Sequence, residues 1–458
     1  MARAGTATAL GRRQRIPACS AKGGLTMPRV LYLCHGHPAF VPGGTETVAH
    51  DLFCSVRDRP GWQAMFIGCV SPLHRQPRPE ARFQTIGRSA DEMLLWVGAF
   101  DRFMLSQTES RSFVDAMSEL LSSFRPDVVH FHHLSRIGLE AVLLVKRLLP
   151  GAKTILTLHD YFAICANDGL MTRPGPGSNG DGNPGSGRLC PAAGPDACHR
   201  CFPEVPQARF AMRSMHIKNV LGTIDWFVAP SAFLRDRYIA WGLPAARMSV
   251  VANGLRPSPA FPLPTAGRRR KRNVFGFFGN IAPHKGVLVA LAAARQLTVE
   301  GVEVSLRLHG GINFQSEQFC RAYDDALQAA GPSVIDLGPY QREQLPLLMS
   351  KVDWAVVPSV WWENAPLVIL EAFQHRRPVI CSDIGGMAEL VEHGVAGLHF
   401  RAGDAADLAR TMQRAARQPA LWQRLSQALP EPAKLDDAVD HHLELYSALL
   451  SKEEALSA

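Results

Sequence analysis

The chain has 458 residues, of which 47% are hydrophobic and 20% are charged, and its formal net charge is +8. At roughly 150 residues per domain, this length allows two domains with cores of their own. No apolar run approaches the roughly 20 residues that a membrane-spanning helix requires. The positive charge favours anionic partners, either small molecules or lipid surfaces. No nucleic-acid-binding motif is present, so nucleic acid is not an expected partner.

The first 26 residues differ from the rest of the chain. They carry several Arg and Lys but no acidic residue, and they lack the apolar stretch of a signal peptide. We therefore expect a disordered extension, or a start codon assigned upstream of the true one. From Met27 onward, short apolar segments alternate with helical patterns, which predicts a parallel sheet covered by helices. Strands are expected at residues 30–34, 64–69, 128–131, 154–158 and 226–229, and helices at 45–56, 112–124, 136–149 and 233–241.

Gly43 and Gly44 open the first expected helix, directly after the first strand. Glycine lets the backbone approach a ligand closely, and a helix N-terminus attracts an anion. The Gly-x-Gly-x-x-Gly pattern is absent here, which counts against an NAD-dependent dehydrogenase. His159 follows a later strand at the same edge of the sheet, where the ligands of such sheets bind.

Glu363 and Glu371 bracket the densest functional pattern of the chain. A strand is expected at residues 354–358, and Pro366 is expected to be the first residue of a helix that continues to Gln374. This helix begins at the carboxyl end of a strand, so its free N–H groups and positive dipole end form an anion site. Two carboxylates beside a phosphate site can hold hydroxyl-bearing groups, a sugar and a ribose, on either side of a diphosphate.

These residues resemble the retaining glycosyltransferases of family 4. The resemblance implies an α/β fold of the GT-B type, in which two Rossmann-like parallel-sheet domains face a central cleft. It extends more loosely from about Met27 to Asp404. The segments that carry it are Pro358-Ser359, Trp361-Trp-Glu-Asn-Ala-Pro366, Glu371-Ala372, Pro378-Val-Ile380 and Ser382-Asp-Ile-Gly-Gly386.

The resemblance also implies a role for individual residues. Glu363 would lie beside the donor sugar, His159 would contact the sugar or its phosphate, and Lys285 would neutralise the donor diphosphate as the bond to the sugar breaks. Glu371 would hydrogen-bond the ribose. The further donor-binding residues would be Leu367 and Val368 through their backbone N–H groups, Gly43, Gly44 and Asn280. The family usually carries Arg near the position of Asn280, and an Asn side chain supplies no charge.

The activity implied is transfer of a sugar from a nucleotide diphosphate donor to a glycan or lipid-linked acceptor, in polysaccharide or glycoconjugate biosynthesis. The protein would be cytoplasmic, with peripheral contact to the anionic inner membrane face as a further option. No catalytic metal is expected. The alternatives are a GT-B sugar-nucleotide epimerase or phosphorylase, and a catalytically idle sugar-nucleotide-binding partner subunit, which Asn280 slightly favours. His130, His132 and His133 are interpreted as structural or acceptor-lining residues without a metal, since neighbouring strand positions point to opposite faces.

The predicted organisation has five parts. Residues 27–255 form an N-terminal acceptor domain after the extension 1–26, and residues 256–272 form a linker that ends in the basic run 268–272. Residues 273–430 form a C-terminal sugar-nucleotide domain, with strands expected from residue 275 and at 304–309, 334–337, 354–358 and 379–381. Residues 431–458 end the chain with a helix, expected at 437–450, that returns to the N-terminal domain.

Ten cysteines in a chain without an export signal favour a reducing compartment over a disulfide framework. Cys165, Cys190, Cys198 and Cys201 belong to a Gly/Pro-rich insertion at residues 165–203, and the last two form a C-x-x-C pair. Four thiolates can hold a structural Zn²⁺ in tetrahedral geometry. The other interpretation is free thiols in a loop near the acceptor.

Overall fold

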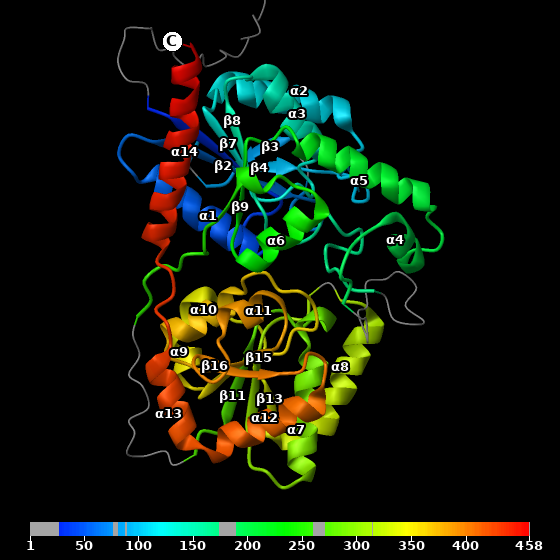
Figure 1. The fold of residues 1–458 in the computed structure, drawn as a ribbon, viewed down its shortest axis with the longest axis vertical. Helices are drawn as coiled ribbons and strands as arrows, with labels where there is room; N and C mark the ends of the chain where they lie inside the picture. Colours follow the sequence, from blue (N-terminus) through cyan, green and yellow to red (C-terminus); the bar gives the residue numbers. More distant parts are fainter. Residues whose placement is uncertain are drawn as a thin grey trace, which may run out of the picture.

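The computed structural model describes residues 27–76, 81–87, 89–173, 189–259, 271–313 and 315–457. The predicted extension 1–26, most of the linker together with residues 268–270 of its basic run, and residues 174–188 of the insertion lie outside these ranges. Figure 1 shows two α/β units, each with a sheet covered by helices, and the final helix alongside the N-terminal unit. No helix in the described ranges combines the length and apolarity needed to cross a membrane.

The N-terminal unit is built on an eight-stranded sheet in the order β10-β9-β8-β7-β1-β2-β4-β3. All neighbouring strands are parallel except β3 and β4. The strands are β1 (Arg29–Cys34), β2 (Gln63–Val70), β3 (Phe83–Thr85), β4 (Glu92–Trp96), β7 (Val128–Phe131), β8 (Lys153–Thr157), β9 (Trp226–Ala229) and β10 (Met248–Val250), and β5 (Phe100–Asp101) pairs with β6 (Ser106–Gln107) in a separate hairpin. The helices are α1 (Gly44–Arg57), α2 (Ser110–Phe124), α3 (Leu139–Leu148), α4 (Pro195–Cys201), α5 (Gln207–Leu221), α6 (Ala232–Trp241) and the 3₁₀ helix η1 (Ala245–Arg247).

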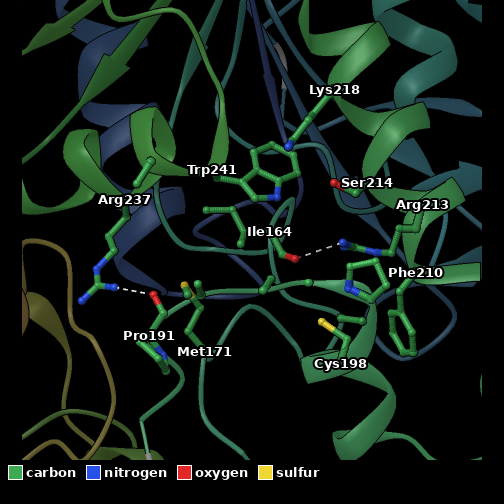
Figure 2. Close-up of a pocket in the computed structure, with 16 residues that line it drawn as sticks. Ile164, Met171, Pro191, Cys198, Phe210, Arg213, Ser214, Lys218, Arg237 and Trp241 are labelled. Atoms are coloured by element: carbon green, nitrogen blue, oxygen red, sulfur yellow. Dashed lines mark hydrogen bonds between the residues drawn. The ribbon is translucent and has the colours of Figure 1, made fainter. Parts of the chain in front are cut away.

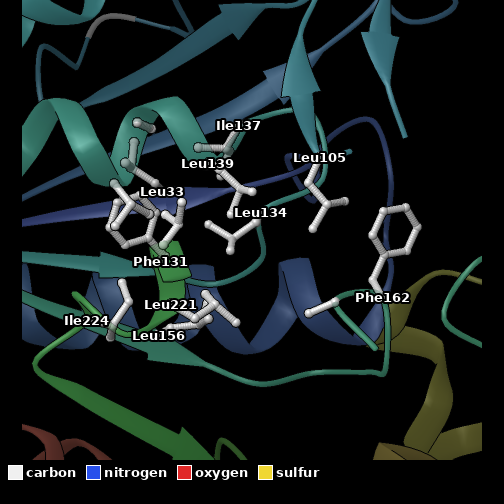
Figure 3. Packing of buried hydrophobic residues seen from close by; sticks show 14 of the residues in the cluster. Leu33, Leu105, Phe131, Leu134, Ile137, Leu139, Leu156, Phe162, Leu221 and Ile224 are labelled. Atoms are coloured by element: carbon white, nitrogen blue, oxygen red, sulfur yellow. The ribbon is translucent and has the colours of Figure 1, made fainter. Parts of the chain in front are cut away.

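Both faces of this sheet are buried, because helices cover both. Strand β1 shows it directly: Leu31 and Leu33 belong to one core cluster, and Val30 and Tyr32 belong to another on the opposite face. Figure 3 shows the first cluster, in which Leu33 lies among side chains from β7, β8 and the segments that follow them. A run of apolar residues without alternation is the pattern expected of a parallel strand covered on both faces.

The C-terminal unit has a six-stranded, fully parallel sheet in the order β13-β12-β11-β14-β15-β16. Its strands are β11 (Val274–Phe278), β12 (Ser305–His309), β13 (Val334–Asp336), β14 (Trp354–Val357), β15 (Val379–Ser382) and β16 (Gly397–Phe400). Its helices are α7 (Val287–Val299), α8 (Glu317–Ala330), α9 (Leu345–Ser350), α10 (Leu367–Gln374), α11 (Gly385–Leu390), α12 (Ala405–Arg417) and α13 (Pro419–Ala428), with the 3₁₀ helices η2 (Pro283–Lys285), η3 (Gly331–Ser333) and η4 (Arg342–Gln344).

The final helix, α14 (Leu435–Ser457), packs against α1 and the N-terminal sheet. Val439 and Tyr446 are buried in the same core cluster as Tyr32 of β1. The Tyr446 hydroxyl lies 2.6 Å from Nδ1 of His130 and 3.2 Å from the hydroxyl of Tyr32. The C-terminal end of the chain is therefore part of the N-terminal core.

Most predicted strands and helices are confirmed to within two residues, and three predictions of detail were wrong. The final helix, expected to end at residue 450, continues to Ser457. Pro366 is the N-cap of α10 and not its first helical residue, since its ψ of 120° is extended. Helix α3 begins at Leu139 and not at Arg136, because Arg136 and Gly138 have φ angles of 63° and 87°. Positive φ angles are incompatible with a right-handed helix.

Candidate functional site

Glu363 is the most constrained acidic residue of the predicted donor motif. It is only 4% exposed, and its Oε1 accepts hydrogen bonds from Nζ of Lys285 at 2.7 Å and from Oγ of Ser359 at 2.8 Å. Burial alone raises the pKa of a carboxyl group, but the ammonium group of Lys285 and the Ser359 hydroxyl outweigh it, so the pKa of Glu363 is lowered. Glu363 is therefore a carboxylate at neutral pH, held against a cation.

Two glycines allow the chain segments around this ion pair to touch. Gly286, directly after Lys285, has a φ of 72°, and a Cβ there would collide with the carbonyl oxygen of Pro358. A Cβ on Gly386 would collide with the carbonyl oxygen of Asn364, and the N–H of Gly386 donates to the carbonyl of Glu363 at 2.7 Å. Close backbone packing from two sides therefore fixes both members of the pair, and it explains the glycines of the Lys-Gly and Ile-Gly-Gly segments.

Helix α10 starts four residues after Glu363. The N–H groups of Leu367 and Val368 lie in its first turn, where no intrahelical acceptor exists. A Cβ on Gly44, at the start of α1, would lie 3.8 Å from Cδ1 of Leu367. The glycine segment of the N-terminal unit and the first turn of α10 thus face each other across the interface between the two units.

Glu371 lies one turn further along α10 and is half-buried. Burial raises its pKa to about 7, and the guanidinium group of Arg342 reduces this shift only in part. The carboxylate of Glu371 in turn raises the pKa of Tyr340, which is chiefly raised by burial. Glu371 therefore exchanges its proton near neutral pH, unlike Glu363.

His159 follows β8 and is half-buried at the interface. Its Nε2 lies 3.1 Å from Nδ1 of the buried His132. Burial and the neighbouring His133 lower the pKa of His159 to about 3, so its imidazole is neutral at physiological pH. The carbonyl of His159 accepts a hydrogen bond from the side-chain amide of Asn364, which places His159 beside the Glu363 segment of the other unit.

The remaining predicted donor residue, Asn280, is exposed in the turn after β11. Of the histidine cluster, His130 and His132 are fully buried, and His133 donates from Nε2 to Asp160 at 2.8 Å while its Nδ1 accepts from the N–H of Ser135. Asp160 is ionised, because His133 lowers its pKa despite burial.

Four functional candidates escaped the sequence analysis. Asn364 bridges the units through His159, and the carboxylate of Glu389 accepts from the N–H groups of Ala232 and Phe233 at 2.9 and 2.7 Å, at the N-terminus of α6. The Tyr161 hydroxyl is fully buried and has no hydrogen-bond partner among the described residues.

The fourth candidate, Glu46, is buried beside Gly43 and has a pKa raised by burial to about 7. Its position in the first turn after Gly-Gly was a usable signal. The other three depend on contacts between distant segments.

The four cysteines of the insertion line one small cavity, together with the first turns after β8 and the helix α4. They are not, however, a preformed metal-binding group: in the described ranges, only His37, His50 and Glu92 bring three ligand atoms within 4.8 Å of one another. A tetrahedral Zn–thiolate site requires sulfur atoms about 3.8 Å apart, given Zn–S bonds of about 2.3 Å. The four thiols line the same cavity, but their sulfur atoms lie further apart than the sulfur atoms of a Zn-bound site.

The His37, His50 and Glu92 group has a different explanation. Oε1 of Glu92 accepts from Nε2 of His37 at 2.7 Å and from Nε2 of His50 at 2.8 Å. Nδ1 of His37 accepts the N–H of Ala39 at 3.1 Å, so Nε2 carries the proton. A protonated Nε2 cannot coordinate a metal, and the group is a satisfied hydrogen-bond network.

Comparison with known families agrees with this arrangement. The "Glycosyl transferase 4-like domain" family matches residues 43–254, and the "Glycosyl transferases group 1" family matches residues 272–418. Together these matches cover the whole donor motif and every strand of the two sheets except β1. The chain thus matches glycosyltransferase families over both of its units, and its fold is of the GT-B type.

Individual relatives match only parts of the chain. The lipopolysaccharide 1,2-N-acetylglucosaminetransferase of Salmonella typhimurium is 28% identical over 183 residues, which are 38% of this chain and 48% of that protein. The alpha-D-kanosaminyltransferase of Streptomyces kanamyceticus is 28% identical over 165 residues, 35% of this chain and 41% of the relative. The chain thus spans about half the length, or less, of these curated relatives.

Solved structures extend the likeness over the whole fold. The sucrose-phosphate synthase of Thermosynechococcus elongatus superimposes with a TM-score of 0.64 at 18% identity, covering 93% of this chain and 100% of that one. Anabaena HepE in complex with UDP gives a TM-score of 0.57 at 17% identity, covering 92% and 100%. These likenesses establish the fold.

Proposed function

We propose that this protein is a retaining glycosyltransferase, which transfers a sugar from a nucleotide diphosphate donor to an acceptor hydroxyl. The observation that carries the proposal is the Lys285–Glu363 pair directly before the N-terminus of α10. A cation and free N–H groups suit a diphosphate, and the adjoining carboxylate suits a sugar that develops positive charge. The UDP in the similarly folded HepE supports a nucleotide donor.

In the proposed reaction, the N–H groups of Leu367 and Val368 and the ammonium group of Lys285 hold the diphosphate. The bond between the sugar C1 and the phosphate oxygen breaks, and the leaving diphosphate takes the electron pair. The acceptor oxygen forms its bond to C1 on the same face, and its proton passes to the leaving phosphate oxygen. Lys285 neutralises the negative charge as it develops on the leaving group.

The two glutamates and His159 hold the donor on either side of the diphosphate. Glu363 faces the sugar, where its carboxylate stabilises the developing positive charge, and Glu371 binds the ribose hydroxyl groups. His159 is neutral because of its low pKa, so it positions the sugar by hydrogen bonding and is not a general acid. Gly43, Gly44 and the uncharged Asn280 complete the donor site without adding charge.

We place the reaction in polysaccharide or glycoconjugate biosynthesis, with a glycan or lipid-linked acceptor, and the protein in the cytoplasm with peripheral contact to the membrane.

Proton NMR of the first product formed from an α-linked donor tests the stereochemistry. An α-linked product is expected, and a β-linked product would refute the retaining assignment. Nucleotide release that needs an added acceptor separates a transferase from an epimerase, a phosphorylase or an idle subunit.

We also propose a structural role for Zn²⁺ at Cys165, Cys190, Cys198 and Cys201. Its support is the single cavity that the four thiols line and the C-x-x-C pair on α4. Burial raises the pKa of the Cys165 thiol to about 12, so the thiol is protonated without a metal. Binding Zn²⁺ would release the thiol protons and draw the sulfur atoms together.

A further inference from the structure

A second cavity, of about 250 Å³, lies beside the insertion and between α5 and α6. This volume has room for several waters, or for a small ring with a substituent. Figure 2 shows Trp241 and Lys218 on one side of this α5–α6 pocket, Arg237 on another, and Pro191 and Cys198 of the insertion along its floor. The apolar part of the lining comes mainly from alanine, proline, Met171 and Phe210 side chains.

The charge of this pocket is one-sided. Its described lining includes three cations, Arg213, Lys218 and Arg237, and no acidic residue. Arg213 is already saturated, because it is buried and donates to four backbone carbonyls. Lys218 and Arg237 have no carboxylate within 4.0 Å in the described part of the chain. Two cations next to an apolar surface, with no counter-charge, suit an anionic ligand.

Both cations lie against aromatic rings that face the pocket or the donor motif. Nζ of Lys218 lies 4.8 Å from the ring centroid of Trp241. The guanidinium group of Arg237 lies 4.5 Å from the ring centroid of Trp362, and it donates to the carbonyl of Pro191 at 2.7 Å. These contacts hold the cationic groups in place but leave their charge uncompensated.

The pocket adjoins the proposed donor site. Trp362, which Arg237 covers, precedes Glu363 in the chain, and its indole N–H donates to the carbonyl of Cys190 at 3.3 Å. The unpartnered Tyr161 hydroxyl is close enough to both Arg237 and Glu363 for their charges to change its pKa.

We propose that the α5–α6 pocket is an acceptor subsite that binds an anionic group, a phosphate or a carboxylate, attached to an apolar or ring-shaped body. Lys218 and Arg237 bind the anion, and the acceptor hydroxyl extends toward the sugar beside Glu363. This inference rests on the proposed function, since it assigns the second substrate of the same reaction. It predicts that the acceptor carries a negative charge, which the donor motif alone does not indicate.

The test uses phenyl phosphate as a probe, titrated calorimetrically into the full chain with UDP at saturation, so that the donor phosphate site is filled. Saturable binding is expected, with the affinity lowered at least about fivefold by Lys218→Met and by Arg237→Met. Methionine keeps an apolar chain of similar length against the aromatic rings. Arg295→Met is the matched control, because Arg295 lines a separate groove between α7 and α8.

The proposal is overturned if phenyl phosphate does not bind saturably, if both variants bind it as tightly as the wild type, or if phenol binds equally well. If benzoate also binds, and its binding depends on Lys218 in the same way, the pocket accepts a carboxylate as the anion. If phenyl phosphate binds and benzoate does not, the pocket is specific for a phosphate. Thermal denaturation checks that the variants are folded. If UDP does not raise the melting temperature of the protein, that result counts against the proposed donor site only. Phenyl phosphate binding is in that case measured without UDP, so the two proposals are tested separately.

Discussion

Replacing Glu363 by Gln tests the proposed chemistry most directly, because the change removes one charge and little volume. The Lys285–Glu363 contact of 2.7 Å corresponds to a gross attraction of about 6 kcal/mol at an effective dielectric constant of 20. Most of it is offset by desolvation, and Lys285 is 29% exposed. The amide oxygen of the substituted side chain would still accept from Lys285 and Ser359, so we expect a loss of only about 1–2 kcal/mol in the free energy of unfolding.

Catalysis should respond more strongly than folding. A carboxylate that stabilises charge developing on the sugar acts mainly in the transition state, so Glu363→Gln should lower kcat by about 10²–10³, or about 2.7–4 kcal/mol. The Kd for UDP should change by less than about threefold, since Lys285 keeps its charge and its hydrogen-bond acceptor. Steady-state kinetics at saturating donor and calorimetry with UDP measure the two effects. The exposed Glu392→Gln is the matched control. A kcat within about threefold of the wild type would refute the role of Glu363 and favour the idle-subunit interpretation.

The remaining predictions concern the ribose contact and the insertion. Because the pKa of Glu371 is raised to about 7 and only its ionised form accepts two ribose hydrogen bonds, the affinity for UDP should fall by up to tenfold per unit as the pH drops from 7 to 5, and should level off above pH 7. Glu371→Gln should weaken binding, raise KM more than it lowers kcat, and abolish this pH dependence; an unchanged profile in calorimetric titrations would contradict the assignment. Protein prepared without chelator should contain about one Zn per chain by elemental analysis. Cys198→Ser combined with Cys201→Ser should lose the metal and lower the Tm, whereas metal-free wild-type protein would exclude the site.

The donor side of the candidate site could be predicted from the sequence because its chemistry is contiguous. Glu363, the first turn of α10 and Glu371 lie within nine residues, so the order of a strand, a Pro and a helix positions them without long-range information. The same holds for the strands, whose apolar runs reflect helices on both faces of each sheet. Local sequence therefore predicts where a strand or helix lies in the chain, but it does not predict which distant segments that element contacts.

What the sequence could not provide are the contacts between distant segments. Asn364 and His159 are 205 residues apart, and their hydrogen bond exists only because two sheets meet at one interface. The pocket was missed for the same reason, since helix α5, which bears Lys218, was not among the predicted helices. Its polar and basic surface conceals the apolar positions that pack inward, such as Phe210 and Ile217.

Three of the contacts that join the two units around the site are of one kind. Asn364 donates to His159, Trp362 to Cys190, and Asn253 to Ala365, in each case from a side chain to a backbone carbonyl. A neutral hydrogen bond of this type contributes about 0.5–1.5 kcal/mol, so no single one locks the interface. In the proposed reaction the sugar enters between the units, and each of these bonds can be exchanged for one to water while it does. The ion pair would behave in the same way: Lys285, which Glu363 holds in this structure, would turn to the diphosphate, and the freed carboxylate would then face the sugar as charge develops there.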